Sequence, residues 1–180
     1  MRFYTVDVKY VRHLFKVDSE VFYEANYFNK PYMGIIYENQ NYNYFIPLTS
    51  AKPKHIRWKN VSKSNYVIYE QVNRTTSIPT NWVYKIDTQN NKIKHILAVL
   101  EIKKMIPVPL GLFSEIDFNQ ISDLSYRALV LKEYNFLKRY ESDIITKADS
   151  IYQKQIGTGI VEPFYCNFRL LENECDNYTK

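Results

Sequence analysis

The stretch from residue 32 to residue 48 constrains the fold of this chain more than any other. Residues 32–38 and 42–48 are rich in aromatic and β-branched side chains, and a polar turn at residues 38–41 lies between them. Two such runs around a polar turn are typical of a β-hairpin. The second strand is expected to end at Pro47 and to be followed by a loop at residues 49–55. Loops that a rigid strand positions often carry functional residues.

The remaining pattern predicts an α+β fold. Asp7 is expected to cap a first helix that runs to Val17, with Lys9 and Tyr10 near the edge of its apolar face. Further helices are predicted over residues 123–141, from residue 142 or 143 to residue 156, and close to the C-terminus. Other strands are predicted at residues 3–6, 66–72, 82–87, 96–100, 105–108 and 164–168. Because no linker interrupts the 180 residues, we expect one domain spanning residues 1–180.

The sequence contains no signal for a membrane or for an oxidising compartment. No apolar run approaches the roughly 20 residues that a membrane span needs, and no apolar signal segment follows Met1. Cys166 and Cys175 are too few for a disulfide framework and lack metal-knuckle spacing, so we interpret both as packing thiols. We expect a cytoplasmic protein that does not bind membranes.

Metal-dependent chemistry is disfavoured by the motifs that the sequence lacks. The three histidines, His13, His55 and His95, are scattered, and the carboxylates form no Asp-x-Asp cluster. There is also no glycine-rich phosphate loop. We therefore predict no metal site and no cofactor.

The main functional signal is an asymmetry of charge. The chain has a net charge of +5, and no acidic residue lies between Glu38 and Glu70. Cations beside aromatic rings suit a groove for single-stranded nucleic acid, although a solvated basic face is the open alternative. The cations of this gap, with His55 and Trp58 among them, are Lys52, Lys54, Arg57, Lys59 and Lys63.

Three residues of the expected loop can act together on a phosphate group. The hydroxyls of Thr49 and Ser50 can fix a phosphate, and the ammonium of Lys52 can counter the charge that develops on its oxygens. RNA supplies its own nucleophile, the 2′-hydroxyl, so such a site needs no metal. The residue that handles protons is left open among Tyr10, Lys30 and His55.

Taken together, these residues resemble the type III toxins of the ToxN/AbiQ family of endoribonucleases. Residues 47–52, Pro-Leu-Thr-Ser-Ala-Lys, are similar to the family's catalytic loop, and the opening residues 1–5 with Lys9 and Tyr10 are similar to its N-terminal signature. The segment from Asn29 and Lys30 to Gly34 and Ile35 resembles its basic loop and central strand. Further similarities, in the same order along the chain, lie at residues 104–107, 126–127 and 166–172.

The resemblance implies a fold, an activity and a site. The fold is a strongly bent antiparallel β-sheet, similar to the Kid/MazF core, with flanking α-helices. The activity is metal-independent, sequence-preferring cleavage of RNA that leaves a 2′,3′-cyclic phosphate and a 5′-hydroxyl. The implied catalytic residues are Ser50, Lys52, Thr49, Tyr10 and Lys30. The residues expected to bind RNA around them are Tyr27, Asn29, Lys54, His55, Arg57 and Lys59.

The resemblance also implies partners. These are a cellular or phage RNA substrate and a small RNA antitoxin, a pseudoknot processed from tandem repeats, which assembles with the toxin into a closed complex that acts in phage defence by abortive infection. Residues 73–94 match no part of the family pattern, and either determine RNA specificity or form a variable hairpin.

Two other classes of function remain open. A non-catalytic RNA-binding regulatory protein would use the same basic stretch, and RNA cleavage distinguishes the enzyme from it. A protein–protein interaction domain would use the aromatic side chains, and its affinity for RNA would not fall steeply with added salt.

Overall fold

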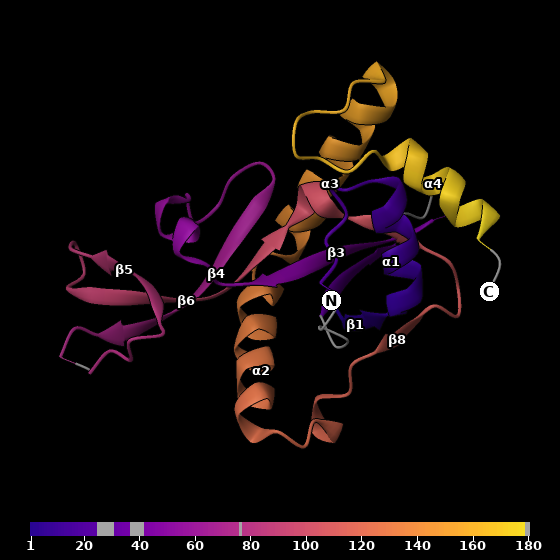
Figure 1. Cartoon of the computed structure of the whole chain (residues 1–180). Helices are drawn as coiled ribbons and strands as arrows, with labels where there is room; N and C mark the ends of the chain where they lie inside the picture. The colour runs from indigo at the N-terminus through magenta and orange to yellow at the C-terminus, as the bar shows by residue number, and fades with distance from the viewer. Residues whose placement is uncertain (25–30, 37–41, 76, 179–180) are drawn as a thin grey trace. The chain divides into compact units, whose positions relative to one another are not determined.

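The computed structural model describes residues 1–24, 31–36, 42–75 and 77–178 (Figure 1). In these residues the protein is mixed α/β, with four α-helices and an antiparallel β-sheet whose eight strands are divided between two compact units. The single domain over residues 1–180 stays a prediction. Unit 1 comprises Met1–Leu48, Glu101–Ile116 and Glu141–Lys180, and unit 2 comprises Thr49–Leu100 and Asp117–Tyr140.

Unit 1 contains the predicted hairpin and three helices. Its strand order is β3-β2-β1-β8, β7 also pairs with β3, and these pairs are antiparallel. The hairpin prediction is confirmed, with Tyr32 opposite Pro47 and Ile36 opposite Asn43. The elements are β1 (Phe3–Val6), α1 (Val8–Val17), β2 (Tyr32–Ile36), β3 (Asn43–Ser50, whose last two residues belong to unit 2), the 3₁₀ turn η2 (Ile102–Lys104), β7 (Ile106–Val108), β8 (Phe113–Glu115), α3 (Glu141–Thr158) and α4 (Phe168–Asn177).

The first helix forms where its cap and its apolar spacing predict. The carboxylate of Asp7 accepts hydrogen bonds from the backbone N–H groups of Lys9 (2.8 Å) and Tyr10 (3.0 Å). Leu14 is buried as expected, but Tyr10 is also buried, with 0% of its surface exposed. The prediction that Tyr10 lies at the edge of the apolar face is therefore wrong. Its ring can be buried because its hydroxyl donates to the carbonyl oxygen of Pro107 at 2.8 Å.

Unit 2 is a small sheet with one long helix. Both β4 and β5 are neighbours of β6, β5 pairs with it in antiparallel register, and α2 packs on β4 (Figure 1). Residues 73–94 thus contain β5, the turn and the start of β6, so a β-hairpin begins in this segment; a role of the segment in RNA specificity stays a prediction. The elements are the 3₁₀ turn η1 (Pro53–Arg57), β4 (Asn65–Asn73), β5 (Val83–Asp87), β6 (Lys92–Glu101), the 3₁₀ turn η3 (Phe118–Gln120) and α2 (Leu124–Lys138).

The end of β3 differs from the sequence prediction. The strand does not end at Pro47 but continues through Thr49 to Ser50. Proline lacks an N–H group, yet the next residue restores the pairing, because the N–H of Leu48 donates to the carbonyl oxygen of Pro31 at 3.0 Å. The expected loop at residues 49–55 is therefore the end of a strand followed by a 3₁₀ turn.

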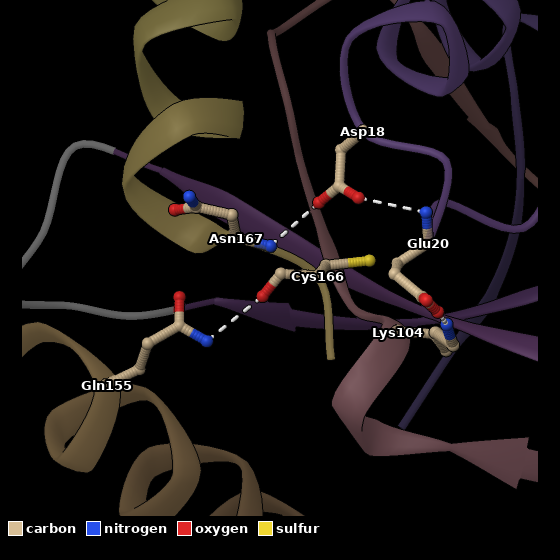
Figure 2. Close-up of polar contacts among 6 residues, drawn as sticks. All are labelled: Asp18, Glu20, Lys104, Gln155, Cys166 and Asn167. Carbon is tan, nitrogen blue, oxygen red and sulfur yellow. Dashed lines mark hydrogen bonds and ion pairs between the residues drawn. The ribbon is translucent and has the colours of Figure 1, made fainter. Parts of the chain in front are cut away.

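The segment before α4 was predicted to be a strand over residues 164–168, and this prediction is wrong. Its backbone groups are bound by other parts of unit 1 instead of by a neighbouring strand (Figure 2). The carbonyl oxygen of Cys166 accepts from Gln155 Nε2 at 3.0 Å, and the N–H of Asn167 donates to the Asp18 carboxylate at 2.8 Å. Cys166 is a buried free thiol and Cys175 is free, as predicted for packing thiols, and burial raises the pKa of Cys166.

Gly34 in β2 provides a test of the packing in unit 1. A Cβ added at Gly34 would lie 2.5 Å from Tyr4 Cε2, and the Tyr4 ring is itself packed against Phe45 and Phe113 at centroid distances of 5.2 Å and 5.5 Å. Gly34→Ala should therefore lower the free energy of unfolding by about 1–3 kcal/mol, measured by urea denaturation. The control is Gly157→Ala in α3, where no atom beyond the adjacent residues and the backbone of the helix itself lies within 4 Å of the new methyl group. Equal stability of the two variants would contradict this packing.

Candidate active site

Three of the predicted catalytic residues lie at the end of β3, but they differ in exposure. Ser50 and Lys52 are exposed, whereas Thr49 is only 2% exposed and its hydroxyl lies 3.4 Å from the carbonyl oxygen of Val99. Thr49 therefore secures the end of β3 to β6 within unit 2, and it does not present its hydroxyl to solvent. The two groups offered to a ligand are the Ser50 hydroxyl and the Lys52 ammonium.

The turn that carries Lys52 is held by a buried imidazole. His55 is 1% exposed, its Nδ1 accepts a hydrogen bond from the backbone N–H of Lys52 at 3.0 Å, and its backbone N–H donates to the Lys52 carbonyl oxygen at 2.8 Å. These two bonds close the turn between the end of β3 and η1. His55 was predicted to contact RNA, and its burial places it behind the turn instead.

The protonation state of His55 follows from this environment. Burial lowers its pKa to about 4, and the cations of Lys54, Lys52 and Lys85 act in the same direction. The ring is therefore neutral at pH 7. Because Nδ1 accepts a hydrogen bond, the proton resides on Nε2, which has no hydrogen-bond partner among the described residues. A group in this state positions the turn and carries no charge at neutral pH.

The other end of the turn is attached to β5. Lys85 Nζ donates to the carbonyl oxygen of Trp58 and, at 3.1 Å, to Asn60 Oδ1. The Trp58 ring packs against the His55 ring with centroids 4.7 Å apart, and Lys54 Nζ lies 5.5 Å from the Trp58 ring centroid. Lys85 was not predicted as a site residue, because the link depends on the register between distant segments and has no local sequence signal.

The charged side chains around this turn face solvent. Lys54, Arg57 and Lys59, all predicted to bind RNA, are exposed in unit 2. No carboxylate forms an ion pair with any of the three within the part of the chain that the structure describes. Exposed cations without neighbouring acids attract a phosphate backbone. The basic stretch read from the sequence is therefore a solvent-facing surface next to Ser50 and Lys52.

The remaining predicted residues do not add to this geometry. Tyr10 belongs to unit 1, where burial raises its pKa and Pro107 occupies its hydroxyl. Tyr27, Asn29 and Lys30 lie outside the described residues.

The described residues offer no cluster of metal ligands. Nowhere among them do three His, Cys, Asp or Glu side chains gather closely enough to hold a metal ion. The helices of the described chain are also too short or too polar to cross a membrane.

The family model of the ToxN toxin of type III toxin–antitoxin systems matches residues 2–176. The chain belongs to the ToxN family. It is similar to endoribonuclease ToxN of Pectobacterium atrosepticum, with 28% identity over 100% of this chain and 95% of the relative. It is also similar to endoribonuclease AbiQ of Lactococcus lactis subsp. lactis, with 26% identity over 100% and 90%.

A solved structure has a fold similar to that of this chain. It comes from work on a processed non-coding RNA that regulates a bacterial antiviral system, and its TM-score is 0.73 at 26% identity over 100% of both chains. The match covers the full length of both chains.

The state of His55 predicts a pH dependence of stability. The pKa of His55 is about 4 in the folded protein, below the ordinary value of 6.5. The neutral ring therefore contributes its full stabilisation to the folded state above pH 6.5, and this stabilisation is lost as the pH falls towards 4. The free energy of unfolding should fall by about 3 kcal/mol from this source. The variant His55→Asn keeps an acceptor for the Lys52 N–H but has no imidazole to protonate. Its free energy of unfolding should therefore not show this decrease between pH 6.5 and 4.

Urea denaturation of both proteins across this pH range measures the difference. The comparison is needed because burial raises the pKa of Glu133 to about 7, which changes stability in the opposite direction. Identical pH profiles would show that His55 is not buried in its neutral form.

Proposed function

We propose that this ToxN-family chain is a metal-independent, sequence-preferring endoribonuclease toxin. The observation that carries the proposal is the exposed pair Ser50 and Lys52 at the rigid end of β3, next to a basic surface. The naming of its relatives as endoribonucleases supports the same activity.

The proposed reaction uses the substrate's own ribose. The 2′-hydroxyl attacks the adjacent phosphorus in line with the departing 5′-oxygen, forming a P–O bond as the P–O5′ bond breaks. The 2′-hydroxyl loses its proton and the 5′-oxygen gains one, so the products carry a 2′,3′-cyclic phosphate and a 5′-hydroxyl. The Ser50 hydroxyl donates to a phosphate oxygen, and the Lys52 ammonium counters the charge that accumulates during the attack.

The buried residues of the predicted set suit supporting roles. Thr49 secures the strand end, and His55 holds the backbone of Lys52. Because the Nδ1 lone pair of His55 already accepts a hydrogen bond and the ring is buried with its proton on Nε2, we exclude it as the general base of this proposal. The assignment of Tyr10 and Lys30 to the catalytic set stays a prediction from the family resemblance.

The biological setting is part of the proposal. A small RNA antitoxin, folded as a pseudoknot and processed from tandem repeats, would assemble with the toxin into a closed complex in the cytoplasm. The system would act in phage defence by abortive infection. The link of a structural relative to an RNA-regulated antiviral system supports this setting.

The shape of the sheet is a separate point. The strongly bent, Kid/MazF-like core that the family resemblance implies stays a prediction.

Substitutions at the exposed pair test the catalytic proposal. Ser50→Ala and Lys52→Ala should each reduce the rate of RNA cleavage by about a hundredfold or more, because each removes a contact to the charged phosphoryl group. Both should also abolish growth inhibition when the chain is expressed without antitoxin. The measurement is cleavage of a labelled RNA by the purified variants.

Two controls sharpen this experiment. Lys16→Ala removes the same charge from an exposed position on α1 and should leave cleavage unchanged. Wild-type cleavage in excess EDTA tests metal independence. Full activity of either site variant would refute the assignment, and RNA binding without cleavage would identify a non-catalytic regulatory protein.

A further inference from the structure

Unit 2 contains a cavity that is separate from the Ser50–Lys52 turn. It is lined by residues of β4, of α2 and the two residues after α2, and by one residue of β6, and it has a volume of about 610 Å³. Ligand sites in proteins commonly have volumes of about 300–1,000 Å³. None of its lining residues was predicted to bind RNA. The residues that matter here are Tyr69, Gln71, Asn135, Phe136, Arg139 and Tyr140.

Aromatic rings form the apolar part of this cavity. Phe136 is buried and contacts the rings of Tyr69 and Tyr140, each at a centroid distance of 5.3 Å. Both tyrosines are half-buried, so part of each ring faces the cavity. Partly exposed rings on a fixed apolar base are the surfaces on which nucleobases stack.

The charge of the cavity favours an anionic ligand. Its single carboxylate, Glu70, is already bound by Lys132 at 2.6 Å and by the His95 ring at 2.9 Å. Arg139 is exposed, with its guanidinium carbon 5.1 Å from the Phe136 ring centroid, and no carboxylate of the described chain pairs with it. A guanidinium held in this way remains available to bind a phosphate through two hydrogen bonds.

Two exposed amides complete the lining. Asn135 on α2 and Gln71 on β4 each offer a hydrogen-bond donor and an acceptor. This combination matches the edge of an unpaired base, which also presents donors and acceptors.

We infer that this cavity binds one unpaired nucleotide of an RNA strand, with the base against Tyr69 and Tyr140 and its phosphate at Arg139. The inference rests on the proposed RNA-directed function and adds a binding site that lies outside the catalytic turn. A double-stranded RNA does not fit, because its bases are stacked and paired. The nucleotide belongs either to the substrate or to an RNA antitoxin, since both offer single-stranded segments.

The test compares two neighbouring cations on α2. Arg139→Ala removes the proposed phosphate contact, whereas Lys138→Ala removes the same charge from a side chain that does not line the cavity. The probe is a short mixed-sequence RNA with 2′-O-methyl riboses, which cannot be cleaved by 2′-hydroxyl attack. We expect Arg139→Ala to weaken binding about tenfold and Lys138→Ala less than twofold. Equal effects would overturn the inference.

Crosslinking locates the bound base independently of any substitution. The wild-type chain is irradiated with the same RNA carrying 5-iodouridine, and crosslinked peptides are identified by mass spectrometry. Crosslinks at Tyr69 or Tyr140 are expected, and crosslinks confined to other peptides would contradict the site. Binding does not require cleavage, so crosslinks at these tyrosines would support the nucleotide site even if the chain is not a nuclease. If the wild-type chain cleaves RNA but the binding test fails, only the nucleotide site in the cavity is refuted.

Cleavage kinetics then separate the two sources of the nucleotide. If the substrate occupies the cavity, Arg139→Ala should raise KM with little change in kcat. If the antitoxin occupies it, Arg139→Ala should instead weaken inhibition by the small RNA that copurifies with the wild-type protein. Unchanged KM together with unchanged inhibition would overturn the inference.

Discussion

The buried imidazole of His55 is the interaction on which the proposed site depends. Its Nδ1 accepts the backbone N–H of Lys52, and the backbone N–H of His55 donates to the Lys52 carbonyl oxygen, so the turn after β3 is fixed from inside the protein. Lys52 can then point its ammonium outward while its backbone is held. Burial keeps the ring neutral, and a protonated ring would lose the acceptor on which the turn relies.

This arrangement separates positioning from contact with RNA. Thr49 and His55 are buried and hold the strand end and the turn, while Ser50 and Lys52 are exposed to solvent. Lys85 secures the far end of the turn through the Trp58 carbonyl. Groups fixed before the substrate arrives need little reorganisation during reaction, which is the main way that a site without a metal can stabilise developing charge.

Local patterns in the sequence predicted much of the fold. The hairpin, the Asp7 cap and the long helices follow from alternation, capping and helical spacing. The errors arose where a side chain finds a distant partner. Tyr10 is buried because Pro107 accepts its hydroxyl, and residues 164–168 are no strand because Gln155 and Asp18 bind their backbone. The sequence predicted Ser50 and Lys52 as site residues, but it could not show that His55 holds the backbone of Lys52 from inside the protein.

The most direct test is to determine whether RNA cleavage requires the 2′-hydroxyl and which end groups the products carry. An RNA that the protein cleaves is prepared with a single 2′-deoxyribose at the scissile nucleotide. The account predicts that cleavage stops at that position, while the unmodified RNA yields a 2′,3′-cyclic phosphate and a 5′-hydroxyl. Continued cleavage of the deoxy substrate, or products ending in a 3′-hydroxyl and a 5′-phosphate, would show that the ribose is not the nucleophile.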